Sequence, residues 1–314
     1  MSVSLRENEA ITPQVLPLPR GVTAKYRRTP IRRQPDSPEP LYNAYFDTSY
    51  GVRWITLSSN RSTRMTYDLV QALRQEQMEV ERRMRADLGK GKQNEIRYQV
   101  LSSAHPKVFN LGGDLDYISK LIRTRDRESL VAFGRLCIDL IYKNATNYNC
   151  PVTTISLVRG TALGGGFEAA LSGNILFAER QSKMGLPEVM FNMFPGMGAY
   201  QLLTQRLAPV QAQRLIQSGR TYTAEELYAL GVVDVLTEEG EGEQAVWDYI
   251  RRHSKQSKGE WGLRRTMLSS NPIRYEELLE SIEIWADTAL SLDDTDMKHM
   301  AFLVRAQRAK SIEG

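Results

Sequence analysis

Cysteines, histidines and long apolar segments are scarce in this chain, and each shortage excludes a class of chemistry. The 314 residues include two cysteines, Cys137 and Cys150, which form neither a disulfide framework nor a metal-binding spacing. The three histidines, His105, His253 and His299, are scattered without any ligand spacing. We therefore predict no metal or other cofactor, and no serine or cysteine nucleophile.

A membrane span and a strong net charge are also absent. No apolar run approaches the roughly 18 residues that cross a bilayer, and the first residues lack the apolar stretch of a signal peptide. The net charge of +4 is too small to indicate a nucleic-acid partner. Because 41% of the residues are hydrophobic, the chain can form a substantial core. We expect a soluble protein of the cytoplasm.

The first 42 residues differ from the rest in composition. Residues 1–40 hold seven of the thirteen prolines, and six basic residues lie between Arg20 and Arg33. Such a segment cannot form a packed core alone. Residues 1–42 are predicted to form an extended arm that is either solvated or wrapped around another subunit.

Apolar strands alternate with helices after the arm. Strands are predicted at 52–57, 96–102 and 152–158, and helices at 65–88 and 114–147. This order predicts an α/β core of βαβ units over residues 43–220.

Residues 221–314 are predicted to be mainly helical. Thr223 and Glu226 have the spacing of a capping box, in which each residue bonds to the backbone of the other. Apolar stripes of helical period lie at 274–292 and 297–308.

A glycine-rich turn follows the strand at 152–158. Its glycines allow a tight turn into a helix that begins near Gly165, and a helix start exposes unpaired N–H groups. A carbonyl oxygen could approach such a donor closely, as a thioester oxygen must when it becomes negative. Glu168 lies in the first turn of this helix.

The chain is expected to bring Glu188 close to Glu168. The helix runs about nine residues outward, roughly 13 Å, and a short strand from Ile175 covers a similar distance back at roughly 3.3 Å per residue. Both carboxylates then lie near one pocket, where burial would raise at least one pKa and allow one acid and one base. The apolar residues expected around them are Leu163, Phe167, Leu186, Met190 and Phe191.

A second glycine turn, Gly112 and Gly113, follows the strand at 96–102. It could present a second backbone N–H, with Asp114 as the N-cap of the next helix. Each feature also has a simpler interpretation. A glutamate in a first turn often only offsets the helix dipole, and a glycine turn is often only a turn. Their combination favours a site.

The motifs at 109–114, 164–168, 185–188 and 194–198 resemble, in order and spacing, those of the crotonase or enoyl-CoA hydratase superfamily. The longer strings at 108–115, 162–172 and 185–191 resemble the bacterial diffusible signal factor synthases. The resemblance covers roughly residues 45–310. It implies a ββα spiral core and a C-terminal helical region that covers the site and builds homo-oligomers such as trimers.

The resemblance also implies the roles of individual residues. The N–H groups of Gly113 and Gly165 would form the oxyanion hole, and Glu168 and Glu188 would be the catalytic pair. The acyl pocket is expected from Leu111, Gly112, Leu163, Phe167, Leu186, Met190, Phe194, Met197 and Trp285.

The implied reaction is dehydration of a 3-hydroxyacyl chain, carried on acyl carrier protein or CoA, to a cis-2-enoyl thioester. Hydrolysis would then release a free cis-2-unsaturated fatty acid that serves as a quorum-sensing signal. Members of this family can be restrained by a signalling protein of the same system, which is the regulatory partner the resemblance suggests. Two alternatives remain open. One is an enoyl-CoA hydratase or isomerase that keeps the thioester, and the other is a crotonase-fold regulatory or binding protein.

Overall fold

The computed structural model describes residues 29–30, 40–59, 63–90 and 95–312, and its larger sheet has the strand order β1-β2-β3-β4-β6-β8-β11. β2 is antiparallel to its neighbours, and the strands from β3 to β11 are parallel. The strands are β1 (Thr29–Pro30), β2 (Tyr42–Asp47), β3 (Val52–Leu57), β4 (Tyr98–Ser103), β6 (Thr153–Val158), β8 (Ile175–Glu179) and β11 (Val235–Thr237).

A second, smaller sheet is built from four short strands, three of which directly follow a strand of the larger sheet. Its order is β10-β9-β7-β5, with β5 (Val108–Asn110), β7 (Thr161–Leu163), β9 (Lys183–Gly185) and β10 (Thr221–Thr223). The chain therefore passes from β4 to β5, from β6 to β7 and from β8 to β9, and then enters a helix each time. The predicted ββα spiral is confirmed.

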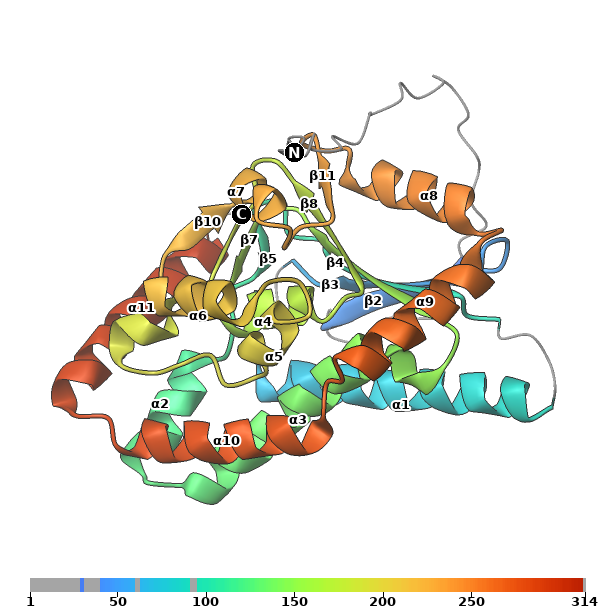
Figure 1. The fold of residues 1–314 in the computed structure, drawn as a ribbon. Coiled ribbons are helices and arrows are strands. Elements are labelled where there is room, and N and C mark those ends of the chain that lie inside the picture. The colour runs from blue at the N-terminus through green and yellow to red at the C-terminus, as the bar shows by residue number, and fades with distance from the viewer. Residues whose placement is uncertain (1–28, 31–39, 60–62, 91–94, 313–314) are drawn as a thin grey trace, which may run out of the picture.

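Helices surround the two sheets (Figure 1). The α-helices are α1 (Tyr67–Gly89), α2 (Leu115–Arg123), α3 (Arg127–Ala145), α4 (Gly165–Leu171), α5 (Ala199–Leu203), α6 (Pro209–Ser218), α7 (Ala224–Ala229), α8 (Gly242–His253), α9 (Ser257–Ser270), α10 (Tyr275–Leu290) and α11 (Asp294–Ile312). Two short 3₁₀ helices are η1 (Asn147–Asn149) and η2 (Pro187–Phe191). No helix in these described ranges combines the length and apolar character needed to cross a bilayer.

Both faces of the larger sheet are buried. Along β3, Val52 and Trp54 belong to a cluster with Trp247 of α8, whereas Ile55 and Leu57 belong to the main core with the residues of α1 and α3. Successive strand residues point to opposite faces. Burial on both faces explains why the parallel strands are continuous apolar runs in the sequence.

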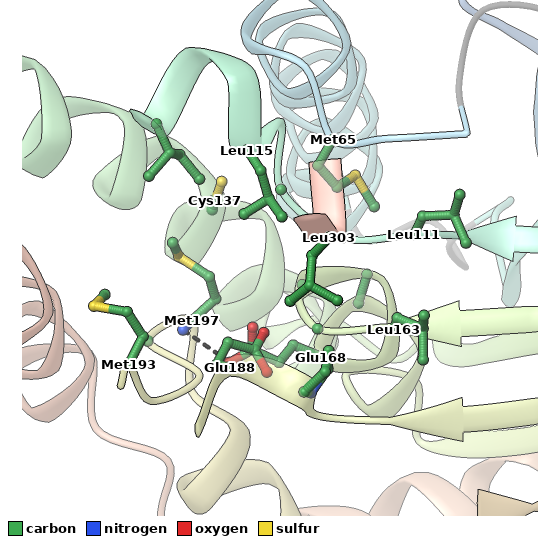
Figure 2. A pocket seen from close by; sticks show the side chains of 18 of the residues that line it. Met65, Leu111, Leu115, Cys137, Leu163, Glu168, Glu188, Met193, Met197 and Leu303 are labelled. Carbon is green, nitrogen blue, oxygen red and sulfur yellow. Dashed lines mark hydrogen bonds between the residues drawn. The ribbon is translucent and has the colours of Figure 1, made fainter. Parts of the chain in front are cut away.

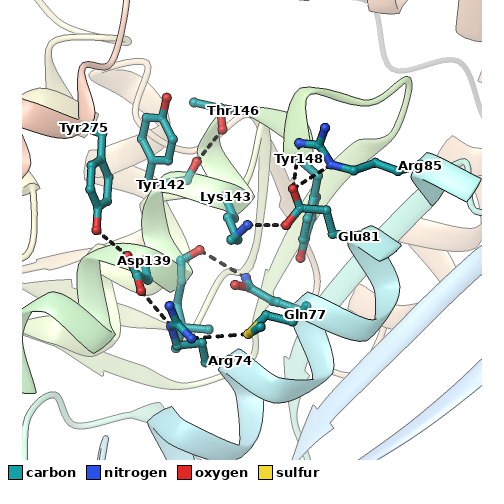
Figure 3. Close-up of polar contacts among 12 residues, drawn as sticks. Arg74, Gln77, Glu81, Arg85, Asp139, Tyr142, Lys143, Thr146, Tyr148 and Tyr275 are labelled. Carbon is teal, nitrogen blue, oxygen red and sulfur yellow. Dashed lines mark hydrogen bonds and ion pairs between the residues drawn. The ribbon is translucent and has the colours of Figure 1, made fainter. Parts of the chain in front are cut away.

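Polar contacts hold α3 between α1 and α10 (Figure 3). The two carboxylate oxygens of Asp139 accept hydrogen bonds from Arg74 Nε of α1 at 2.6 Å and from the Tyr275 hydroxyl of α10 at 2.5 Å. One helical turn further on, Lys143 pairs with Glu81 of α1. The position of α3 is thus fixed from two sides.

Several predictions of secondary structure are confirmed and one is wrong. The strand at 52–57 has the predicted ends, and the capping box at Thr223 and Glu226 is present with N···O distances of 3.2 and 2.8 Å. The single helix predicted at 114–147 is instead α2 and α3. They are separated where Arg125 adopts φ 53° and Asp126 caps α3 by accepting the Ser129 N–H at 3.0 Å.

The boundary regions contain strands that the sequence did not reveal. β10 and β11 lie in the region expected to be mainly helical, and each joins one of the two sheets. β1 lies in the predicted arm and pairs with Phe46 and Tyr45 of β2. The rest of the arm through residue 39 lies outside the described residues.

Candidate active site

The turn between β7 and α4 depends on Gly164. This residue has φ +51° and ψ −128°, and its N–H bonds to the Gly185 carbonyl at 2.9 Å. A Cβ at this position would overlap Oε1 of Glu188. Because Gly165 is the first residue of α4, its N–H has no acceptor within the helix. The turn therefore brings a backbone donor close to the carboxyl of Glu188.

Glu168 is fixed in place by two backbone amides. It is 1% exposed, and its Oε1 accepts the N–H groups of Met197 at 2.8 Å and Ala199 at 3.0 Å. Gly198, at φ +98°, allows the chain to turn so that both neighbouring N–H groups point at one oxygen. The carboxyl of Glu168 thus has a set orientation (Figure 2).

Glu188 lies in η2 and faces Glu168 across the same space (Figure 2). The residue as a whole is half-buried, but its Oε2 is enclosed. No group in the described part of the chain donates a hydrogen bond to this oxygen. Glu188 therefore presents an uncommitted carboxyl oxygen to the interior.

Burial raises the pKa of both carboxyls well above the ordinary glutamate range. For Glu168 the negative charge of Glu188 raises the pKa further, and the two backbone hydrogen bonds oppose the rise. Two neighbouring carboxyls in an apolar space do not readily ionise together. A pair of this kind that holds one proton can use one group as a base and the other as an acid.

The second glycine turn lies directly beside the first. Gly112 has φ +90°, and its carbonyl accepts the Met65 N–H at 2.8 Å. An ideal Cβ on Gly112 would lie 3.2 Å from the Gly165 nitrogen, and one on Gly165 would lie 3.5 Å from the Gly113 nitrogen. Backbone nitrogens from two distant segments therefore border one small space, as an oxyanion hole requires.

A cavity of about 310 Å³ opens onto these groups and is otherwise mostly apolar. Six of the nine residues expected in the acyl pocket line it: Leu111, Gly112, Leu163, Met190, Met197 and Trp285. Gly113, Gly165, Glu168 and Glu188 line it as well.

Three of the residues expected in the acyl pocket are not among those that line it. Phe167 precedes Glu168 in α4, so its side chain is turned by roughly 100° about the helix axis, and it lies fully buried in the core. Leu186 is also buried in the core, and Phe194 packs against its edge.

Sequence reasoning expected the C-terminal helices to cover the site, but it did not name the wall residues of α3 and α11. α3 contributes Phe133, Cys137, Leu140 and Ile141, and α11 contributes Met300 and Leu303. The apolar periodicity of these helices predicts a buried face, but it does not tell a core face from a cavity wall. Burial raises the pKa of the Cys137 thiol, which keeps it protonated.

Asp114 has a different role from the one expected. It occupies the N-cap position of α2 but makes no side-chain capping bond there. Its carboxylate instead pairs with Arg64 at 3.1 Å. Asp116 pairs with the same Arg64 nitrogen, also at 3.1 Å. Across the ranges that the structure describes, no three His, Cys, Asp or Glu side chains are grouped to hold a metal ion.

The alternating sheets, the two glycine turns and the facing carboxyls define the crotonase class of fold and site. Residues 66–260 match the family model described as enoyl-CoA hydratase/isomerase, and the chain belongs to this family. It is an enzyme of the hydratase and isomerase type.

Individual relatives agree with this membership. Cyclohexa-1,5-dienecarbonyl-CoA hydratase of Thauera aromatica is 30% identical over 220 residues, which are 69% of this chain and 78% of that protein. Human mitochondrial delta3-delta2-enoyl-CoA isomerase has a TM-score of 0.71 at 14% identity, over 86% of this chain and 99% of that chain. Pseudomonas aeruginosa DspI has a TM-score of 0.61 at 22% identity, over 81% and 98%. At these identities, the two structures bear on the fold alone.

Proposed function

We propose that this protein catalyses the addition and removal of water at the 2,3 double bond of an enoyl-CoA thioester with an apolar acyl chain. The observation that carries the proposal is the facing pair Glu168 and Glu188, buried in an apolar cavity beside two glycine turns. Membership of the hydratase/isomerase family supports the same chemistry.

The thioester carbonyl is assigned to the space between the backbone nitrogens of Gly113 and Gly165. When the proton on C2 leaves, negative charge moves to the carbonyl oxygen. Donors that already point at this oxygen stabilise the enolate without reorganising.

The two carboxyls are assigned opposite tasks in dehydration. Glu188 removes the C2 proton, because its Oε2 has a lone pair that no protein donor uses. Glu168 protonates the 3-hydroxyl as the C3–O bond breaks, and the electrons of the C2–H bond form the double bond. Water leaves, and the pair holds one proton before and after the step. Hydration is the reverse of these steps.

The wall of the cavity suits a flexible hydrocarbon chain. Met190, Met193 and Met197 contribute adaptable thioether side chains, and Trp285 contributes a broad apolar surface. An acyl chain could bury its apolar area there while the thioester remains at the glycine turns.

Thioester hydrolysis on an acyl carrier protein is the second candidate function. The strings at 108–115, 162–172 and 185–191, which resemble those of the diffusible signal factor synthases, favour it. In this version, either ionised carboxylate would activate a water molecule toward the same polarised carbonyl. The enzyme would then release a free cis-2-unsaturated fatty acid.

Product analysis tests both versions. The purified protein is incubated with a medium-chain 3-hydroxyacyl-CoA and, separately, with the same chain on acyl carrier protein, and the products are identified by mass spectrometry. We expect an enoyl thioester that disappears in the Glu188→Gln variant. A free cis-2 acid would favour the second candidate, and intact substrate in both incubations would contradict the proposal.

A crotonase-fold binding protein is the remaining alternative. It predicts that Glu168→Gln leaves partner binding unchanged and that wild-type protein shows no turnover of either thioester. The same incubations therefore separate an enzyme from a binding protein.

A further inference from the structure

Asn110 lies at the point where the two glycine turns meet. It is the last residue of β5 and is fully buried, and it pairs in register with Ala162 of β7. β5 leads to Gly112 and Gly113, and β7 leads to Gly165. The two strands that deliver the proposed oxyanion donors are thus direct neighbours at this residue.

The side chain of Asn110 holds the first turn. Its Oδ1 accepts the N–H of Gly112 at 2.9 Å. An asparagine that bonds to the backbone two residues further on fixes the direction of the chain between them. This bond fixes the Leu111–Gly112 peptide, which is next to the peptide that carries the Gly113 nitrogen.

The same residue also supports the second turn. An ideal Cβ on Gly166 would overlap the Asn110 carbonyl oxygen and would lie 2.9 Å from Asn110 Oδ1. The start of α4 therefore rests directly on Asn110, and the absence of a side chain at residue 166 permits this contact. A shift of Asn110 would move the Gly165 donor relative to the Gly113 donor.

We propose that Asn110 is a positioning residue that sets the separation of the two oxyanion donors, an inference that rests on the proposed function. It is not among the residues that line the cavity, and its contacts with Gly112 and Gly166 are with the turns behind the cavity wall. Its effect is therefore expected in the rate of the chemical step and not in ground-state binding.

Asn144 provides a matched control. It is also a buried asparagine, and its Nδ2 donates to Ser172 Oγ at 2.8 Å, at the opposite end of α4. It does not line the cavity. Loss of Asn144 should lower the stability of the fold without moving the glycine turns.

The test measures kcat and KM with a medium-chain trans-2-enoyl-CoA, together with the carbonyl stretching frequency of the bound thioester by Raman difference spectroscopy. Asn110→Ala should lower kcat by roughly 10-fold to 100-fold with little change in KM, since small displacements of catalytic groups cost about this much. The carbonyl frequency should return toward its value in free solution. Asn110→Ser should recover part of the lost kcat and part of the carbonyl shift, because a hydroxyl accepts the same N–H more weakly than an amide oxygen does.

Asn144→Ala should keep the wild-type kcat and carbonyl frequency while lowering the melting temperature. A folded Asn110→Ala or Asn110→Ser variant with wild-type kcat and carbonyl frequency would overturn the inference about Asn110 alone. Equal losses of kcat in Asn110→Ala and Asn144→Ala would also overturn it, because destabilisation would then explain both. If the wild-type protein itself shows no carbonyl shift and no turnover, the proposed function fails and this inference fails with it.

Discussion

At the scale of single residues, Glu168 and Glu188 share one space but differ in what holds them. Glu168 is anchored by two backbone amides, and Glu188 has an uncommitted oxygen. Glu168→Gln and Glu188→Gln should each lower the rate of hydration by at least about 100-fold, the usual worth of a positioned acid or base. Steady-state kinetics with an enoyl-CoA measure the rate, and circular dichroism shows whether each variant is folded. Normal turnover by a folded variant would remove the role assigned to that residue.

The acid and base roles proposed for the two carboxyls predict an unusual dependence of the rate on pH. In the dehydration of a 3-hydroxyacyl-CoA, activity should be lost at low pH when Glu188 binds a proton and at high pH when Glu168 loses its proton. Because burial raises both pKa values, both limbs of the kcat/KM profile should lie above the ordinary glutamate range. Since a glutamine cannot ionise, Glu168→Gln should lose the alkaline limb. A wild-type acid limb at the ordinary glutamate pKa would contradict this assignment.

The same raised pKa values predict how stability changes with pH. Each carboxyl binds its proton more tightly in the folded than in the unfolded chain. Their contribution to stability is therefore fully present below the unfolded glutamate pKa and is lost as the pH rises through the raised folded pKa. Thermal melts from acid to mildly alkaline pH should show a smaller alkaline loss of stability for Glu168→Gln than for wild type. An equal loss in both proteins would mean that Glu168 is not the buried acid.

At the scale of secondary-structure elements, the start of α4 offers a sharp comparison between neighbouring glycines. A Cβ on Gly165 would make ordinary contacts of 3.5 Å or more, whereas a Cβ on Gly166 would overlap the Asn110 carbonyl. Gly165→Ala should fold but lose at least about 100-fold in rate, because the methyl group crowds the carbonyl oxygen. Gly166→Ala should be strongly destabilised. Melting temperatures and kcat of the two variants check this, and a stable, fully active Gly166→Ala would show that α4 does not rest on Asn110.

The elements also show what sequence reasoning could reach. Strand β3 and the capping box at Thr223 follow local rules of apolar patterning and capping, so their positions were predictable. The break at Arg125 was not, because no glycine or proline marks it and the cap at Asp126 is a common surface residue type. The short strands of the smaller sheet are three residues long, which is too short for a periodic signal.

The candidate site also has parts that the sequence could predict and parts that it could not. The sequence motifs pointed to the glycine turns and to Glu168 and Glu188, since these residues lie in three short segments with characteristic spacing. The resemblance implied that C-terminal helices cover the site, but the wall residues of α3 and α11 could not be named, because they depend on how distant helices pack. Asn110 lies within the motif at 109–114, but its contacts with Gly112 and Gly166 are visible only in three dimensions.

At the scale of the whole molecule, the two ends of the chain should tolerate truncation differently. In the described part of the chain, the strands of both sheets and the residues that line the cavity lie from Thr29 onward, so we expect deletion of residues 1–28 to leave a folded, active protein. Truncation after residue 220 removes β10 and β11, which pair with β9 and β8, and removes α10 from the core. This shorter chain should fail to fold. Soluble yield and thermal melting check both, and a folded protein that ends at residue 220 would contradict the sheet pairing.

Homo-oligomers, a regulatory signalling partner and a location in the cytoplasm remain predictions. Light scattering on the purified full chain measures the first of these directly. A mass of one chain at working concentration would mean that the single chain supplies the entire site.

The glycines of the site have a consequence for how this gene can change. Any missense mutation of a glycine codon adds a Cβ atom. At residues 112, 160 and 166 that atom would press on neighbouring backbone, which cannot move aside as a flexible side chain can. Gly89, Gly259 and Gly262 have open space around the same position and no comparable barrier. Residues 112, 160 and 166 should therefore remain glycine in functional copies of the protein. Of these two sets, natural variation should accumulate only at Gly89, Gly259 and Gly262.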